Sequence, residues 1–155
     1  MSQLYRHERI QDIGTQLFAA AGAEESQAAI ATAALVQSSL MGHDSHGVMR
    51  IPEYLGFIDD GSLKPAAETI TTETGPSTAR VDCGYGFGAV GGAVAIEKGI
   101  EIAREHQTAC VITRECNHVG RLGAYTQMAA DAGFIALATC NSPIYGHFVL
   151  PFGGK

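Results

Sequence analysis

The sequence predicts an α/β protein in which a helical N-terminal region leads into the beginning of a second α/β unit. Hydrophobic residues make up 46% of the 155 residues and charged residues 17%, which is typical of a globular chain. The first 60 residues show helical spacing of apolar side chains, whereas helix and strand patterns alternate from residue 89 onward. We therefore expect a helical region over residues 1–75 and the first part of an α/β domain over residues 76–155.

Two helices are expected within the first 42 residues. Gly22 ends the first helix, and the second begins near residues 24–26 with acidic residues in its first turn. The predicted inner face of the first helix is Ile10, Ile13, Leu17, Phe18 and Ala21. The predicted inner face of the second is Ala29, Ala33, Val36 and Leu40.

A third helix is expected to begin at Ile51-Pro52, because proline suits the first turn of a helix, and to end at Gly61. Residues 62–80 contain prolines and alternating threonines, a pattern typical of short strands and turns. Later helices are predicted over residues 89–106 and 122–132, and strands over residues 109–114 and 134–140. This order predicts a mainly parallel sheet.

Residues 141–155 contain no element that would complete a domain. We therefore expect the chain to be truncated, and residues 1–155 to be inactive alone, because the last predicted strand would leave a sheet edge and an apolar face uncovered.

Composition narrows the partners and the compartment. The formal charge of -6 argues against a nucleic-acid partner. The sequence has no run of about 18 apolar residues, which a membrane span would require. The N-terminus lacks the apolar centre of a signal peptide. The four cysteines include no CxxC pair, so we expect reduced thiols, no metal site and a cytoplasmic protein.

The first chemically informative segment, residues 43–50, reads HDSHGVMR. Arg50 can bind a carboxylate through two parallel hydrogen bonds, Ser45 can donate another, and the imidazole of His46 can transfer a proton near neutral pH. These groups meet the needs of a 2-hydroxy acid dehydrogenase. In the alternative interpretation, Asp44 or Ser45 merely caps the following helix. A metal pair formed by His43 and His46 lacks a third ligand at a persuasive spacing.

The second segment, residues 117–123, reads NHVGRLG and follows a predicted strand. Ligands gather at the carboxyl ends of parallel strands, where Gly120 and Gly123 permit close approach to the backbone and Arg121 can meet a phosphate. The alternative is a glycine-rich turn with an ordinary surface histidine at His118. Cys116 could be a nucleophile beside His118, but no geometry is specified.

A third pattern, GxGxxG, is formed by Gly86, Gly88 and Gly91 between a possible strand and a helix, with Glu115 where a ribose-binding acid would lie. It raises the alternative of a Rossmann dehydrogenase. Against it, the preceding strand carries Arg80 and Asp82, whereas a buried parallel strand should be apolar. The other interpretation is that these glycines pack a helix closely against the sheet.

Residues 44–55 (DSHGVMRIPEYL) and 117–143 (NHVGRLGAYTQMAADAGFIALATCNSP) resemble the malate/L-lactate dehydrogenase family, which is distinct from the Rossmann dehydrogenases. The ending LPFGGK also resembles a family segment, and the similarity extends from about residue 10 to residue 155. Members of this family act on malate, lactate, ureidoglycolate, diketogulonate, sulfolactate and cyclic imino acids.

The resemblance implies a homodimer with an unusual, non-Rossmann nicotinamide-binding fold that uses NAD or NADP. It implies that His46 is the proton donor or acceptor, with Ser45 and Arg50 at the substrate. His118 would sit at the same site, as a second acid/base or a cofactor contact. The residues implied to lie near the cofactor are His118, Gly120, Arg121 and Leu122.

We therefore expect an oxidoreductase that converts R-CHOH-COO⁻ and NAD(P)⁺ into R-CO-COO⁻, NAD(P)H and a proton, with a malate- or lactate-type substrate. Two alternatives stay open: a Rossmann enzyme that uses Gly86, Gly88 and Gly91, and a non-catalytic fragment that only packs or dimerises. The sequence selects neither the particular acid nor NAD over NADP.

Overall fold

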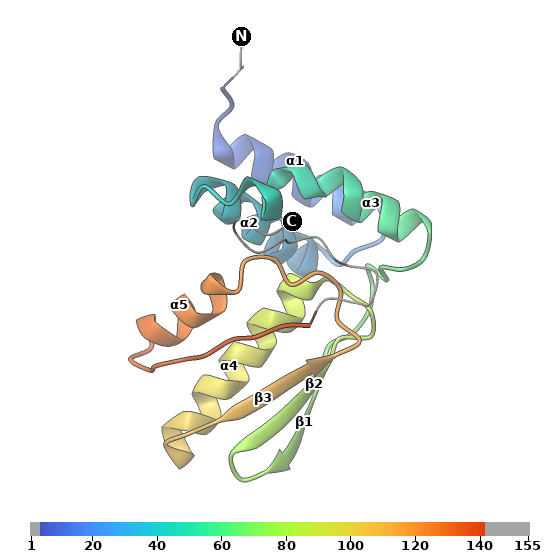
Figure 1. The fold of residues 1–155 in the computed structure, drawn as a ribbon. Helices are drawn as coiled ribbons and strands as arrows, with labels where there is room; N and C mark the ends of the chain where they lie inside the picture. Colours follow the sequence, from blue (N-terminus) through green and yellow to red (C-terminus); the bar gives the residue numbers. More distant parts are fainter. Residues whose placement is uncertain (1–3, 142–155) are drawn as a thin grey trace, which may run out of the picture.

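A computed structural model describes residues 4–141 of the chain (Figure 1). Three α-helices come first, and two strands, a helix, a third strand and a last helix follow in that order. The α-helices are α1 (His7–Ala20), α2 (Glu25–Leu40), α3 (Ile51–Asp59), α4 (Gly88–His106) and α5 (Gly123–Asp131). The strands are β1 (Ile70–Gly75), β2 (Thr78–Asp82) and β3 (Cys110–Arg114), and two short 3-10 turns, η1 (Asp44–His46) and η2 (Val48–Arg50), precede α3.

The sheet has the order β1-β2-β3. β1 and β2 form an antiparallel pair, and β2 and β3 form a parallel pair joined through α4. The expected α/β class is confirmed, but "mainly parallel" is wrong for the described strands, because the short turn at residues 76–77 returns the chain beside β1. The antiparallel pair also joins residues on either side of the expected boundary between residues 75 and 76.

Figure 1 shows α1, α2 and α3 gathered at one end of the sheet, near the start of α4. In the parallel pair Asp82 lies beside Arg114, so β2 and β3 both run toward this helical end. The carboxyl edge of the parallel strands therefore faces the segment that precedes α3.

The helical region packs around an aromatic cluster. Phe18 of α1 is fully buried, and its ring centroid lies 5.1 Å from that of Phe87 and 6.1 Å from that of Tyr54. The three N-terminal helices were predicted correctly, with Gly61 at positive φ after α3 as expected of a stop. Burial of Phe18 alone would contribute about 2–3 kcal/mol.

The predicted inner faces of α1 and α2 are partly wrong. Ile13 and Leu17 are 44% and 41% exposed, and Leu40 is 59% exposed. The two helices meet through small residues instead, because a Cβ at Gly14 would lie 2.6 Å from the Thr32 methyl. The buried residues of α2 are Ala28, Ala31, Thr32, Leu35, Val36 and Ser38. The prediction of the inner faces was based mainly on the spacing of large apolar side chains. The helices pack closely here, and only small side chains fit between them.

The glycines at 86–91 pack α4 against its surroundings. A Cβ at Gly88 would overlap the carbonyl oxygens of Asn117 and His118, and one at Gly91 would overlap the Cys83 sulfur. Gly86, Gly88 and Gly91 are all buried. These contacts occupy the space that a pyrophosphate would need, so the packing interpretation is confirmed and the phosphate-loop interpretation is wrong.

The predicted strand at residues 134–140 is not a strand. The segment has no ladder partner among residues 4–141, although exposed and half-buried residues alternate along it, and Ile135 and Leu137 are almost fully exposed. Its pattern is that of a strand, but a strand requires a neighbour. The expectations for residues 142–155 lie outside the described residues. No helix within residues 4–141 is both long and apolar enough to cross a membrane.

Candidate active site

The segment before α3 is held against α2 by a close backbone approach. Gly47 is buried, and a Cβ there would overlap the hydroxyl of Ser39. The same hydroxyl accepts a hydrogen bond from the backbone N–H of Val48 at 3.1 Å. Two 3-10 turns result, and they place His46 and Arg50 on the side that faces the sheet edge. The glycine of the Ser-His-Gly element therefore has a packing role.

Ser45 and His46 contact each other directly. The Ser45 Oγ lies 2.9 Å from His46 Nδ1. Neither Asp44 nor Ser45 forms the expected helix cap, because no side-chain cap bond is present at η1, η2 or α3. The Ser45 hydroxyl is thus in a position to orient the His46 ring.

Arg50 is held by two neighbours. Its Nε donates to the backbone carbonyl of Ser45 at 2.6 Å, and its Nη1 forms an ion pair with the Glu53 carboxylate. Both side chains of this pair are partly exposed. The guanidinium is therefore pre-positioned beside the segment that carries His46.

His118 reaches the same place from the loop after β3. Its Nδ1 lies 2.7 Å from the hydroxyl of Tyr54, which belongs to α3 and is 3% exposed. Its neighbour Asn117 donates to the backbone carbonyls of Tyr85 at 2.6 Å and Ser62 at 3.1 Å. The loop is thus tied to both the helical region and the β2–α4 connection.

The two histidines, 72 positions apart in sequence, form a ring pair whose centroids lie 5.2 Å apart. Burial is the main cause that lowers the pKa of each ring, and the positive charge of Arg50 lowers both further. Each imidazole is therefore mainly neutral at pH 7. In each ring the Nδ1 atom is engaged, so Nε2 is the atom available for proton transfer.

Tyr54 stays protonated, because burial raises the pKa of its phenol. A phenolic O–H that donates to Nδ1 fixes the His118 proton on Nε2. The ring of Tyr54 lies in the aromatic cluster while its hydroxyl meets the site, so one residue joins core and site.

The residues predicted to contact the cofactor lie at the start of α5. Gly120 has φ +72°, and a Cβ at this position would find open space. The Nε of Arg121 is buried and has no hydrogen-bond partner among the described residues. Leu122 is the N-cap residue of α5, where helical N–H groups point outward. A buried, unpaired arginine nitrogen beside an open backbone suits an anionic group.

Other chemistry suggested by the sequence finds less support. Within residues 4–141, no three His, Cys, Asp or Glu side chains come together as a metal site requires. Cys83, Cys110, Cys116 and Cys140 are free thiols.

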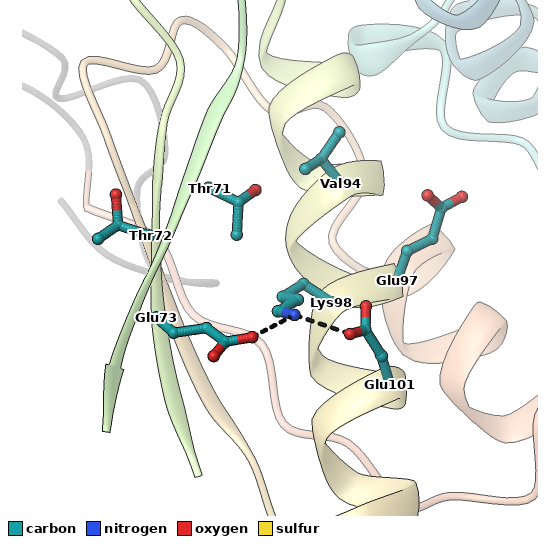
Figure 2. Close-up of a pocket in the computed structure, with 7 residues that line it drawn as sticks. All are labelled: Thr71, Thr72, Glu73, Val94, Glu97, Lys98 and Glu101. Atoms are coloured by element: carbon teal, nitrogen blue, oxygen red, sulfur yellow. Dashed lines mark hydrogen bonds and ion pairs between the residues drawn. The ribbon is translucent and has the colours of Figure 1, made fainter. Parts of the chain in front are cut away.

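An open groove of about 730 Å³ lies between β1 and α4, away from His46 and His118 (Figure 2). Figure 2 shows Lys98 between Glu73 and Glu101, with Nζ to carboxylate distances of 2.7 and 2.8 Å. Glu97 also lines it. Three carboxylates against one ammonium would repel an organic acid, so the groove is a poor candidate for a substrate site.

Sequence reasoning missed Ser39, Glu53 and Tyr54. Glu53 could have been found from its i,i+3 spacing to Arg50. Tyr54 gives no such signal, because at its position in α3 it looks like an ordinary core residue. Ser39 resembles any small residue in a tightly packed helix.

The fold and the site together define a class: an α/β protein with a histidine pair and an arginine at the carboxyl edge of a parallel strand pair. The chain belongs to the malate/L-lactate dehydrogenase family, whose sequence model matches residues 5–155.

Two curated relatives and one solved structure illustrate the relationship. Over 86% of its own length, the chain is 32% identical to the L-sulfolactate dehydrogenase of Methanocaldococcus jannaschii. Over 86% of its own length, it is 37% identical to the malate dehydrogenase of Pyrococcus abyssi. The structure of malate dehydrogenase from Pyrococcus horikoshii OT3 matches 82% of the chain with a TM-score of 0.78 and 31% identity. The chain spans 38%, 36% and 36% of these three proteins, respectively.

Proposed function

We propose that the protein is a nicotinamide-dependent 2-hydroxy acid dehydrogenase in which His46 is the acid/base and Arg50 binds the substrate carboxylate. The observation that carries the proposal is the pairing of His46 and His118, with the charge of Arg50 acting on both rings. The names of the relatives, a sulfolactate and a malate dehydrogenase, support a small hydroxy acid as substrate.

Arg50 orients the acid. Its Nε and one Nη1 donor are engaged with Ser45 and Glu53, which leaves the end of the guanidinium formed by Nη1 and Nη2 to meet a carboxylate. Burial and, to a smaller extent, the same positive charge lower the pKa of His46, so its Nε2 can accept the proton of the substrate hydroxyl. The Ser45 hydroxyl holds the ring through Nδ1 during this transfer.

The cofactor residues are His118, Gly120, Arg121 and Leu122. The unpaired Arg121 Nε and the open backbone at Gly120 fit an anionic group of a dinucleotide. A bound nicotinamide, NAD or NADP, supplies the hydride acceptor. His118 then closes the site beside His46, as cofactor contact or second acid/base, in the tautomer set by Tyr54.

In this proposal residues 1–75 carry the substrate side, residues 76–155 begin the cofactor-binding unit, and the protein works as a homodimer. Because the chain spans only 36–40% of the length of four curated relatives, we also propose that residues 1–155 alone are inactive. Sedimentation of the full protein and a parallel assay of the 155-residue chain test these points.

The central test is a hydride-transfer assay of the full protein with malate, lactate, sulfolactate and their oxo acids, using NAD and NADP in turn. His46→Ala should lower kcat by roughly two to four orders of magnitude, the usual contribution of a positioned acid/base. The matched control is His106→Ala, which removes an exposed histidine at the end of α4 and should leave the rate unchanged. A loss below about tenfold across pH 6–9 would remove His46 from this role. No turnover of any acid, with no nicotinamide binding, would favour the non-catalytic alternative.

A further inference from the structure

Two of the four free cysteines lie together beneath the site. Cys83 directly follows β2 and is 1% exposed, and Cys116 lies two residues after β3 and is partly buried. Cys110 and Cys140, in contrast, are exposed. No step of the proposed reaction uses any of these thiols.

The backbone brings Cys83 and Cys116 side by side, just beyond the ends of the neighbouring strands β2 and β3. Beyond the last ladder pair, the N–H of Cys83 still donates to the carbonyl of Arg114 at 3.0 Å, and the N–H of Tyr85 donates to that of Glu115 at 2.6 Å. The two segments therefore stay adjacent beyond the sheet, about 4.8 Å apart, and Cys116 lies one residue past Glu115, the residue opposite Cys83, which gives a diagonal Cα separation of roughly 6 Å. Disulfides join Cα atoms roughly 4.4–6.8 Å apart.

The side chains converge on one point of α4. A Cβ added to Gly91 would overlap the Cys83 sulfur and lie 3.2 Å from the Cys116 sulfur. The missing side chain of Gly91 thus creates the space in which the two sulfurs meet.

The pair is also chemically unequal. A hydrogen bond from the Cys83 thiol lowers the pKa of Cys116, and this same bond is the main cause that raises the pKa of Cys83. Cys116 is the more exposed of the two and the one that ionises more readily, so it is the sulfur that an oxidant meets first, with Cys83 behind it as the resolving thiol.

We propose that Cys83 and Cys116 form a redox modification site, at which a peroxide converts the two thiols into a reversible intramolecular disulfide. The Cys116 thiolate attacks the O–O bond, forms an S–O bond and releases hydroxide. The Cys83 sulfur then attacks the resulting sulfenic acid, the S–S bond forms, and water leaves with the Cys83 proton. In sum, two thiols and one hydrogen peroxide give one disulfide and two waters. An added dithiol reverses the reaction by exchange.

The bond would affect the site through the next two residues of the chain. A disulfide holds its sulfurs about 2.05 Å apart, so its formation draws Cys116 toward β2. Asn117 and His118 follow directly, and their carbonyls already lie tightly against Gly88. The His118 ring must then shift relative to His46.

The test treats the native full protein with hydrogen peroxide, blocks remaining thiols with an alkylating agent, and maps the peptides by mass spectrometry without reduction. The expected result is a linked peptide pair that contains Cys83 and Cys116, with two fewer titratable thiols, restored by dithiothreitol. The control variant Cys110→Ser/Cys140→Ser should give the same linked pair. In Cys83→Ser, a sulfenic-acid probe should label Cys116.

Recovery of Cys83 and Cys116 as separately alkylated residues, while Cys110 or Cys140 is oxidised, would overturn the proposal. So would a disulfide between two chains in place of the internal one. Both readouts are independent of hydride transfer, so they stand apart from the outcome for the proposed function.

Discussion

Gly88→Ala is expected to damage both stability and activity, although alanine normally favours a helix. A Cβ at this first residue of α4 would lie 2.5 Å from the carbonyl carbon of His118 and would overlap the carbonyl oxygens of residues 117 and 118. The site loop must retreat by about 1 Å to reach ordinary contact. Overpacking of this kind costs about 1–3 kcal/mol, and the better helix propensity of alanine offsets at most about 1 kcal/mol.

With the full offset, the net loss is up to about 2 kcal/mol, which should lower Tm by as much as roughly 8 °C. A displacement of about 1 Å at the His118 loop should also reduce kcat/KM by as much as about 100-fold. Thermal unfolding followed by circular dichroism, together with the hydride-transfer assay, measures both effects. The matched control is Gly99→Ala in the same helix, where a Cβ would lie 3.6 Å from the nearest Val111 carbon. This variant should be unchanged or stabilised by about 0.5–1 kcal/mol. If the Gly88 and Gly99 variants behaved alike, the close packing of α4 on the site loop would be refuted.

Three further predictions concern the site itself. Arg50→Lys should raise KM for the acid about tenfold while KM for the cofactor stays constant, because an ammonium loses the planar two-point contact; a change in the cofactor constant alone would reassign the residue. Tyr54→Phe should lower kcat about five- to tenfold, the effect of one lost hydrogen bond, and should shift the pH profile, whereas Tyr85→Phe, a change at an exposed tyrosine, should do neither. When the enzyme oxidises the 2-hydroxy acid, kcat/KM should fall only below a pH of about 6.5. Burial and the charge of Arg50 lower the pKa of both His46 and His118, so the neutral form of the base persists to lower pH. An acid limb above that value, measured with a substrate that does not titrate, would contradict the assignment.

Most of the fold was predictable because it follows from local signals. Helical spacing and glycine stops predicted the positions of α1 to α3, and the alternation of patterns from residue 89 onward predicted α4, β3 and α5. Residues 134–140 show the limit of this reasoning. Phe134 to Cys140 have the composition of a strand, but strand formation depends on a hydrogen-bonding neighbour that local sequence does not reveal.

From local sequence patterns the candidate site was predictable residue by residue but not as an arrangement, whereas the family resemblance implied that His46 and His118 share one site. His46 and His118 each stood in an informative motif, yet their ring contact depends on how α3 and the β3 loop pack. The sequence did not indicate Tyr54 as a site residue, because its ring belongs to the core and only its hydroxyl reaches the site. Side chains that serve packing and chemistry at once carry no distinct periodicity.

Because the hydroxyl of Tyr54 contacts His118, the histidine pair depends on α3 staying folded. α3 has nine residues, and a helix of that length is marginal in water without its tertiary contacts. Transient unfolding of α3 would move Tyr54 away from His118 and break the ring contact between His46 and His118, while the sheet stayed folded. Thermal inactivation would then precede global unfolding. The local opening of α3, rather than the unfolding of the whole molecule, would set the upper temperature at which the site persists. Amide hydrogen exchange in α3 would measure this opening.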